Sequence, residues 1–361
     1  MNRIAFGALL ALASASAAFA QDAGFGRLEY LGQIVLPTGL KLAGVEFGGI
    51  SGLDYDAANA QFYAISDDRS QKAPARLYTL KLQADEKGVS ALDIVASHEL
   101  TGADGKAFAE GGVDPEAIRL DTRNGKLYWS SEGDAEGKPA VFEASLDGKF
   151  SRAFQVPAHY MPNADKTAGV YGNLAFEGLA LSMDGQTLWA ATENGLMQDG
   201  DKATLEAGSP SRLIAFDVAS GEAKAEYVYE TGKIFAKATT EPAYNDNGLS
   251  EIMTLDDTHL LAIERSFGSG IGNEINLFVV DLAGATDISG AETIKGMSVT
   301  PVSKTHVLKI GEGDFGLDID NIEAVSFGPE IAGKRTLVLA SDNNFNLAGQ
   351  FTQFVVFTLA N

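Results

Sequence analysis

The sequence predicts an all-β protein, a single β-propeller of four-stranded antiparallel blades, with five blades favoured over an alternative of six. The first observation is a pattern that occurs five times: a short apolar strand, an Asp/Gly turn, and a second strand followed by an acidic residue. A third strand, and usually a fourth, follows each copy. No stretch beyond the first twenty residues shows a helical period. Repetition of a strand-rich unit at this spacing indicates blades arranged around an axis.

The strands of each repeat follow from alternating apolar residues bounded by turn-forming residues. The first strands begin at Ser51, Glu116, Glu177, Glu251 and Glu323. The second strands are expected over 61–66, 126–131, 187–192, 259–263 and 336–341, and the third over 76–82, 140–146, 212–218, 274–282 and 353–359. Fourth strands are expected over 92–100, 151–156, 223–229 and 301–310. Turns such as Asn124-Gly125 and Asp184-Gly185 separate consecutive strands.

The fifth repeat has only three strands. Residues 27–36, at the other end of the chain, read as a strand without a partner. An N-terminal strand that completes the last blade closes the ring and removes two exposed edges. The prediction is therefore one propeller domain over residues 25–361. A diverged sixth blade, if present, would lie around 196–210 or 283–300.

Residues 1–20 read as a secretory signal peptide. Arg3 supplies the positive start, residues 4–18 form an apolar run too short to span a membrane, and Ala18-Phe19-Ala20 fits a cleavage site. No later segment is long and apolar enough for a membrane span, and the chain has no cysteine for a disulfide framework or a lipid anchor. We expect an exported protein, in the periplasm or outside the cell.

The charge balance is strongly acidic, with 49 Asp and Glu against 27 Lys and Arg and a formal net charge of −22. This excess argues against nucleic acid and anionic membrane surfaces as partners. We expect a monomer that binds a small-molecule ester or a phosphorylated substrate.

The acids of the repeat are the candidate functional residues. In a propeller, the first strand lines the central channel, and its start emerges on the same face as the end of the second strand. At this face the central channel should open as a funnel lined by acids. The acids expected there are Glu116, Glu177, Glu251 and Glu323 from the first strands, and Asp67, Asp68, Glu132, Glu193, Glu264 and Asp342 after the second strands. Asp114, Asn173, Asn247 and Asn321 would join them from the preceding loops.

Carboxylates gathered around one axis repel one another, and a hard cation with six to eight oxygen ligands relieves that repulsion. The set therefore predicts Ca²⁺, whereas the absence of His and Cys from these positions argues against Zn²⁺. The alternative is that each acid only binds a neighbouring backbone and fastens one blade to the next.

A basic residue follows the acid in two copies, at Arg69 and Arg265. Beside carboxylates, an arginine is either a structural ion-pair partner or a clamp for phosphate or carboxylate. Together with Ca²⁺, it would supply the charge neutralisation that hydrolysis of a phosphate ester requires.

Taken in order, several segments resemble an exported bacterial family known as phytase-like, or "esterase-like activity of phytase". The matching segments are Ser66-Asp-Asp-Arg69, Asp114-Pro-Glu116, Ser130-Ser-Glu132, Phe176-Glu-Gly-Leu-Ala180, Glu264-Arg-Ser-Phe267, Asp320-Asn-Ile-Glu323, Ser341-Asp-Asn-Asn-Phe345 and Gln350-Phe-Thr-Gln353. The resemblance implies a propeller that hydrolyses phosphate or carboxylic esters. It also implies Ca²⁺ in the funnel, because the better understood propeller phytases bind phosphate in this way.

The leading hypothesis is a Ca²⁺-dependent hydrolase of phosphate esters that acts outside the cytoplasm. Glu177 would be the general base, Arg69 and Arg265 the phosphate clamp, and the metal ligands would come from Glu116, Glu177, Glu251, Glu323, Asp68, Glu132, Glu193, Glu264 and Asp342. One alternative is a non-catalytic binding propeller with structural calcium. Another is a carboxyl esterase or lactonase that uses the same metal.

Overall fold

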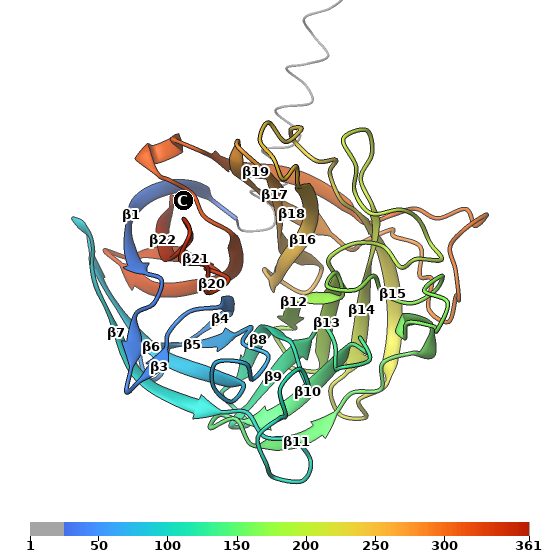
Figure 1. Ribbon diagram of the computed structural model, residues 1–361, viewed down its shortest axis with the longest axis horizontal. Helices are drawn as coiled ribbons and strands as arrows, with labels where there is room; N and C mark the ends of the chain where they lie inside the picture. The colour runs from blue at the N-terminus through green and yellow to red at the C-terminus, as the bar shows by residue number, and fades with distance from the viewer. Residues whose placement is uncertain (1–24, 361) are drawn as a thin grey trace, which may run out of the picture.

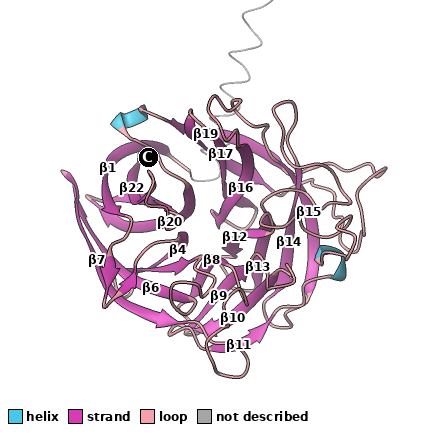
Figure 2. Cartoon of the chain, viewed as in Figure 1, coloured by secondary structure: helices cyan, strands magenta, loops and turns pink. Residues whose placement is uncertain are grey.

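The computed structural model describes residues 25–360, which form five four-stranded antiparallel sheets around a central channel (Figure 1). The predicted all-β propeller with five blades is confirmed. Apart from two 3₁₀ turns, Ala158–Tyr160 and Asp314–Gly316, the regular structure of this range is β (Figure 2). Neither turn is long or apolar enough to cross a membrane. The expected signal peptide, residues 1–20, lies outside the described residues.

Four blades are formed by consecutive strands that run from the channel to the rim. Blade 1 contains β4 (Ile50–Asp56), β5 (Gln61–Ser66), β6 (Arg76–Asp85) and β7 (Gly88–Glu99). Blade 2 contains β8 (Pro115–Asp121), β9 (Lys126–Ser131), β10 (Ala140–Ser145) and β11 (Phe150–Ala153). Blade 3 contains β12 (Phe176–Leu181), β13 (Thr187–Thr192), β14 (Pro210–Asp217) and β15 (Ala223–Glu230). Blade 4 contains β16 (Asn245–Thr254), β17 (His259–Gly268), β18 (Gly272–Asp281) and β19 (Ser303–Gly311).

Blade 5 joins the two ends of the chain, as predicted. Its strands are β20 (Ile322–Ile331), β21 (Lys334–Ser341), β22 (Phe351–Ala360) and β1 (Arg27–Pro37). β1 pairs antiparallel with β22 from Arg27 opposite Ala360 to Pro37 opposite Phe351, which leaves neither end strand unpaired on that side. A small hairpin of β2 (Lys41–Leu42) and β3 (Val45–Glu46) leads into blade 1.

The hydrophobic core consists of five clusters, one at each interface between neighbouring blades. Both faces of each sheet therefore pack against another sheet, which explains the apolar residues on both sides of the inner strands. Representative pairs across successive interfaces are Ile65 and Trp129, Tyr128 and Leu179, Leu213 and Ala262, Ile263 and Leu337, and Val338 and Leu53. Because the clusters complete a circle, the inner strands are held at fixed positions around the channel.

The alternative of a sixth blade is wrong. Residues 196–209 and 283–302 contain no strand and fold over the outside of blade 3. The buried Arg212 of β14 bonds both carboxylate oxygens of Asp199, at 2.7 and 3.0 Å, and its Nη1 lies 2.9 Å from Glu226 of β15. Asp199 also accepts the backbone N–H of Ile294. One buried ion-pair network thus fixes both loops to an existing blade.

A buried ion pair crosses the channel below the funnel. Arg119 of β8 lies 2.8 Å from Glu251 of β16, and its guanidinium also donates to the carbonyls of Leu53 in β4 and Ile252 in β16. Glu251 Oε1 in turn accepts the backbone N–H of Leu179 in β12. The pair therefore connects the inner strands of four blades.

Replacing Arg119 by methionine should destabilise the protein strongly, because Glu251 would keep its carboxyl group in the channel without a cation. Loss of one member of a buried pair costs about 3 to 5 kcal/mol in the free energy of unfolding. Urea denaturation would measure this loss. The double variant Arg119→Met/Glu251→Met should recover much of it, and a loss below about 1 kcal/mol in the single variant would contradict the assigned role.

Candidate functional site

Two positions recur in each blade at the funnel end of its inner strands, and seven of these ten side chains line the funnel cavity. The first position lies near the start of the innermost strand, where the pairing with the second strand shifts in register. In blades 1 to 5 it is occupied by Ser51, Glu116, Glu177, Ser250 and Glu323. We call this the inner position. The second position lies on the second strand of the blade or just after it, one residue beyond the residue that pairs with the start of the innermost strand. It is occupied by Asp67, Glu132, Glu193, Arg265 and Asp342. We call this the outer position.

The register of blade 4 corrects two predicted site residues. Leu249 pairs with Glu264 and Glu251 with Ile263, so the inner and outer positions belong to Ser250 and Arg265. Side chains alternate across a strand, and a shift of one residue turns each of them to another side. Glu251 consequently lies in the channel against Arg119. Glu264 points away from the funnel and binds the Tyr229 hydroxyl at 2.7 Å, the Gly232 N–H and Lys304.

Asp68 is a third residue whose expected placement is wrong. Its carboxylate is 2.6 Å from Arg76 and accepts the backbone N–H groups of Gln71, Lys72 and Ala73. Asp68 thus organises the loop after β5, and its oxygens are saturated by donors of that loop and of β6. The adjacent Asp67 is the residue that turns into the funnel.

The funnel contains a cavity of about 710 Å³. Its walls include six of the acids expected there, together with both arginines singled out from the sequence. These residues are Asp67, Glu116, Glu177, Glu193, Glu323, Asp342, Arg69 and Arg265. Asn173 and Asn321 also line it, whereas Asn247 binds Gly232 and Glu264 at the side of blade 4.

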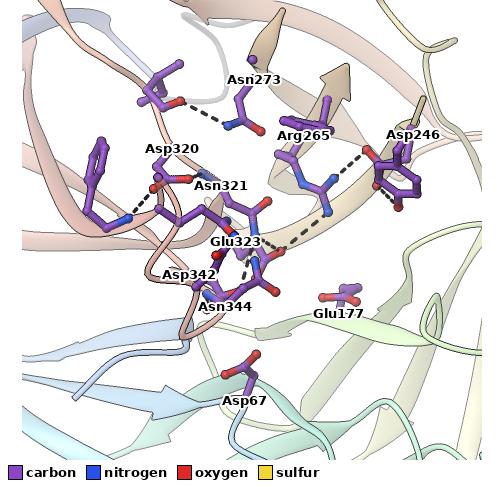
Figure 3. A pocket seen from close by; sticks show the side chains of 18 of the residues that line it. Asp67, Glu177, Asp246, Arg265, Asn273, Asp320, Asn321, Glu323, Asp342 and Asn344 are labelled. Carbon is purple, nitrogen blue, oxygen red and sulfur yellow. Dashed lines mark hydrogen bonds and ion pairs between the residues drawn. The ribbon is translucent and has the colours of Figure 1, made fainter. Parts of the chain in front are cut away.

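One side of the funnel is neutralised by Arg265 (Figure 3). Its guanidinium is 2.8 Å from Asp246, 3.7 Å from Glu193 and 3.7 Å from Glu323. Asp246 also accepts the Tyr244 hydroxyl. Sequence reasoning missed both Asp246 and Tyr244. The Asn245-Asp-Asn247 segment just before the fourth repeat was the available signal, but only the extension of β16 to Asn245 brings it to the funnel.

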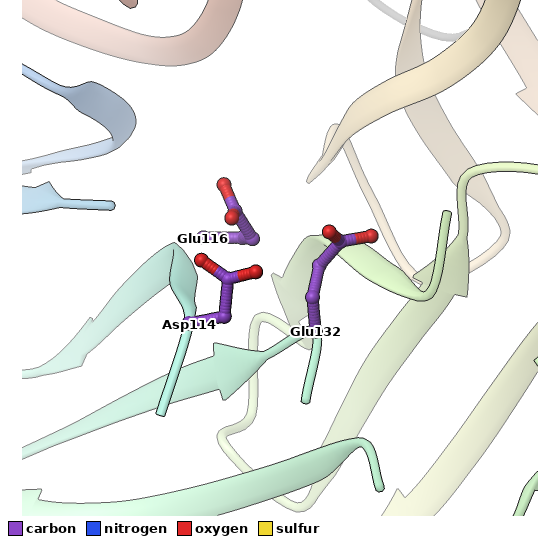
Figure 4. Close-up of side chains that lie close together, drawn as sticks. All are labelled: Asp114, Glu116 and Glu132. Atoms are coloured by element: carbon purple, nitrogen blue, oxygen red, sulfur yellow. The ribbon is translucent and has the colours of Figure 1, made fainter. Parts of the chain in front are cut away.

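The other side of the funnel gathers acids, and three of them, Asp114, Glu116 and Glu132, are drawn in Figure 4. Oxygens of Asp114, Glu116 and Glu132 lie within 4.8 Å of one another, and so do oxygens of Glu132, Glu177 and Glu193. We call these five residues the carboxylate cluster. Glu132 is common to both groups and is only 3% exposed. The cluster joins acids of blades 2 and 3, and all five of its members were among the residues that the sequence placed in the funnel.

The unpartnered oxygens of the site are informative. Glu132 Oε1 accepts the backbone N–H of Ala175, but its Oε2 finds no hydrogen-bond donor among residues 25–360, and neither does Asp67 Oδ1. A buried carboxylate oxygen in this state is costly unless it shares a proton or binds a cation. The cluster is therefore built for one or the other.

Burial is the main cause of raised pKa values in the funnel, and neighbouring carboxylates add to it. It raises the pKa of Glu132 to about 7, with Asp114 as the principal like charge. It raises the pKa of Asp114 to about 6, although Arg69 opposes the change, and that of Asp67 to about 8. The pKa of Glu177 is also well above its usual range. In the absence of a metal, Glu132 and Glu177 lie close enough to share a proton, and so do Asp114 and Glu116.

Arg69 differs from Arg265 in its exposure. It contacts Asp114 and Asn173 at the rim, and its side chain remains 43% exposed, against 12% for Arg265. An arginine with part of its donor fork free can bind an incoming anion. Of the two predicted clamp residues, Arg69 is therefore the one placed to meet a ligand that enters from solvent.

Comparison with known proteins places these features in context. Residues 45–345 match the family described as "Phytase-like: Esterase-like activity of phytase". A protein of Arthroderma benhamiae named "Uncharacterized secreted protein" is 25% identical over 153 residues, which cover 35% of this chain and 29% of that protein. The match thus spans less than a third of that relative's length.

Solved structures with a similar backbone have low sequence identity. The structure titled "Structure of Dos1 propeller" has a TM-score of 0.34 at 11% identity and aligns over 90% of this chain and 82% of its own. The bifunctional GH43-CE protein of Bacteroides eggerthii has a TM-score of 0.42 at 11% identity, over 85% of this chain and 33% of its own. Hydrazine synthase of Kuenenia stuttgartiensis has a TM-score of 0.36 at 10% identity, over 81% and 64%.

Proposed function

Because this chain belongs to the phytase-like family, whose description names an esterase-like activity, we propose that it is an exported, Ca²⁺-dependent hydrolase of phosphate esters. The substrate would enter the funnel and meet the carboxylate cluster at its wall. Export, to the periplasm or beyond the cell, is supported by the predicted signal peptide and by a relative named as secreted. Together with the acidic surface charge, this favours a small soluble substrate.

The carboxylate cluster supports Ca²⁺ as the cofactor. Its ligands are all oxygens, the type that Ca²⁺ prefers, and oxygens bound to one Ca²⁺ at about 2.3 to 2.6 Å lie no more than about 5 Å apart. The observation that carries the proposal is Glu132, a buried acid with other carboxylates on two sides and one oxygen that lacks a donor in the described part of the chain. When bound, Ca²⁺ would supply positive charge to the non-bridging oxygens of the phosphate.

The chain's own residues supply the remaining roles. Arg69 would orient the phosphoryl group from the rim through the exposed part of its guanidinium. Glu177 lines the cavity beside Glu132, so it is placed to take the proton from the attacking water while the P–O bond to the alcohol breaks. Burial raises the pKa of Glu177, which makes its carboxylate a stronger base than that of an exposed glutamate.

The proposal is tested with metal-stripped protein and chromogenic phosphomonoester, phosphodiester and acyl ester substrates. We expect phosphate ester hydrolysis that appears on adding Ca²⁺ and disappears with excess chelator. Glu177→Gln keeps the shape of the side chain and should lower that activity and Ca²⁺ binding together. Hydrolysis restricted to acyl esters would favour the carboxyl esterase, and no hydrolysis with any substrate would favour the binding propeller.

Arg69→Ala should lower kcat/KM for a phosphate ester by about tenfold, because the clamp is partly exposed and its charge is screened. A neutral acyl ester provides the comparison and should be nearly unaffected. Arg69→Lys keeps the charge without the fork and should show an intermediate loss. Equal losses on both substrate classes would instead indicate that the substitution disturbs Asp114 and the funnel wall.

A non-catalytic binding propeller with structural calcium is the second candidate function. It is favoured by the pairing of Arg265 with three acids, which leaves only one of the two predicted clamp arginines with substantial exposure. In that case Ca²⁺ would raise the melting temperature, Tm, and the substrate panel would remain unreacted.

A further inference from the structure

The outer position carries an acid in blades 1, 2, 3 and 5 and an arginine, Arg265, in blade 4. We infer that Arg265 is a fixed internal cation, which removes its side of the funnel from metal binding and limits the funnel to a single Ca²⁺ at the carboxylate cluster. This inference rests on the proposed function, because it takes Ca²⁺ as the metal. Beyond the proposed function, it specifies how many Ca²⁺ ions bind, where the ion binds, and that Arg265 determines both.

The contacts of Arg265 support the role of an internal cation. Its guanidinium is held between Asp246, at 2.8 Å, and the acids Glu193 and Glu323, each at 3.7 Å. These acids belong to blades 4, 3 and 5, so the side chain contacts its own blade and both neighbouring blades. Figure 3 shows its contacts with Asp246 and Glu323. The side chain is largely buried, and a charge held there is weakly screened by solvent. A divalent cation beside it would be repelled and would have to share its ligands.

The packing around Glu193 holds this boundary in place. A β-carbon at Gly248 would lie only 2.2 Å from Glu193 Oε1, so glycine is required for the carboxylate to rest against β16. From there, Glu193 is close enough to Arg265 for an ion pair and also shares a group of oxygens with Glu132 and Glu177. Glu193 thus marks the border between the neutralised side and the side open to a metal.

The carboxylate cluster is the place left for Ca²⁺. Of its five acids, only Glu193, at the border, has a buried arginine beside it within the described residues, and Arg69 touches only Asp114 of the five, at the exposed rim. The independent sign of a ligand is again Glu132, which is 3% exposed and whose Oε2 finds no donor within the described range, 25–360. Asp67 Oδ1 also finds no donor in that range, but Asp67 belongs to neither group of three close carboxylates, so the carboxylate cluster is the place for the single ion.

The test counts bound Ca²⁺ by equilibrium dialysis and follows Tm with and without the ion. We expect one Ca²⁺ per chain in the wild-type protein. Arg265→Gln should free Glu193, Glu323 and Asp246, bind a second Ca²⁺, and gain more in Tm from the ion than the wild type does. Arg265→Lys retains the charge and should still bind one. If Arg265→Gln does not survive metal stripping, its ions are counted after purification in excess Ca²⁺.

Arg76→Gln is the matched control. Arg76 is also a buried arginine paired with an acid, Asp68, but it lies outside the carboxylate cluster. This variant should lose stability and still bind one Ca²⁺. The inference is overturned if Arg265→Gln binds one ion, if Arg265→Lys binds two, or if the wild type binds two or more. A wild type that binds none overturns the calcium proposal itself, and the single site with it.

Discussion

Replacing Glu132 by glutamine should abolish the stabilisation of the protein by Ca²⁺. Glu132 contributes to both oxygen groups of the carboxylate cluster, so its loss weakens the whole site rather than one ligand. At a hundredfold excess over Kd, a ligand that binds only the native state adds about 2.7 kcal/mol. For a chain of this length, that is a shift in Tm of about 4 °C. We expect this shift in the wild-type protein and none in Glu132→Gln.

The same variant should behave in the opposite way when no metal is present. Glutamine removes one negative charge from a buried group of carboxyls, so metal-free Glu132→Gln should melt at or above the wild-type Tm. Glu143→Gln is a suitable control, because Glu143 is equally buried but pairs with Lys126 and Arg152 at the edge of blade 2. It should lose stability and keep the full response to Ca²⁺. A Glu132→Gln protein with an unchanged response would remove Glu132 from the metal site.

The metal-free protein should become less stable as pH rises from 5 to 8. Folding raises the pKa of Asp114 to about 6, of Glu132 to about 7 and of Asp67 to about 8. In that range the folded state binds protons that the unfolded chain has released, so the free energy of unfolding falls with increasing pH. The stability that these groups contribute is complete below the pKa values of the unfolded chain, which are near 4. It is lost as the pH rises through the pKa values of the folded protein. Thermal melts in chelator would measure the trend.

Calcium binding should show the reverse dependence on pH. The cation competes with the protons shared by Glu132 with Glu177 and by Asp114 with Glu116, and each proton released makes affinity tenfold stronger per pH unit. Because the pKa values of Asp114 and Glu132 are about 6 and 7, the release of both protons would give roughly a tenfold gain in affinity between pH 6 and 7. Calorimetry in buffers of different ionisation enthalpy would count the protons. An affinity that is constant from pH 6 to 8 would be incompatible with Ca²⁺ at this cluster.

The strand pattern was readable from the sequence because it is local. Alternating apolar residues and Asp/Gly turns located the strands of all five blades, and the unpaired segment 27–36 predicted the closure that β1 makes with β22. The acids at Glu116, Glu177 and Glu323 were also placed correctly in the funnel. In these three blades the sequence repeat and the strand register coincide, so counting residues was sufficient.

Blade 4 shows where counting fails. Its sequence copy aligned Glu251 and Glu264 with acids of other blades, yet the register places Ser250 and Arg265 at those positions. A shift of one residue is small in an alignment but reverses the direction of a side chain in a strand. Asp68 was misplaced for a related reason, because the loop after β5 offers its carboxylate three backbone N–H groups that only the folded chain assembles.

The sequence by itself determined the repeated β architecture, its closure by the first strand and the acidic character of one end of the channel. Only the tertiary structure decided which acids face one another and that Arg265 neutralises one side of the funnel. It also decided that, among residues 25–360, Glu132 has an oxygen without a partner on the other side. The physical reason is range. Strand formation depends on neighbours along the chain, whereas pairing and burial of charge depend on distances of a few ångströms between residues that blade packing brings together.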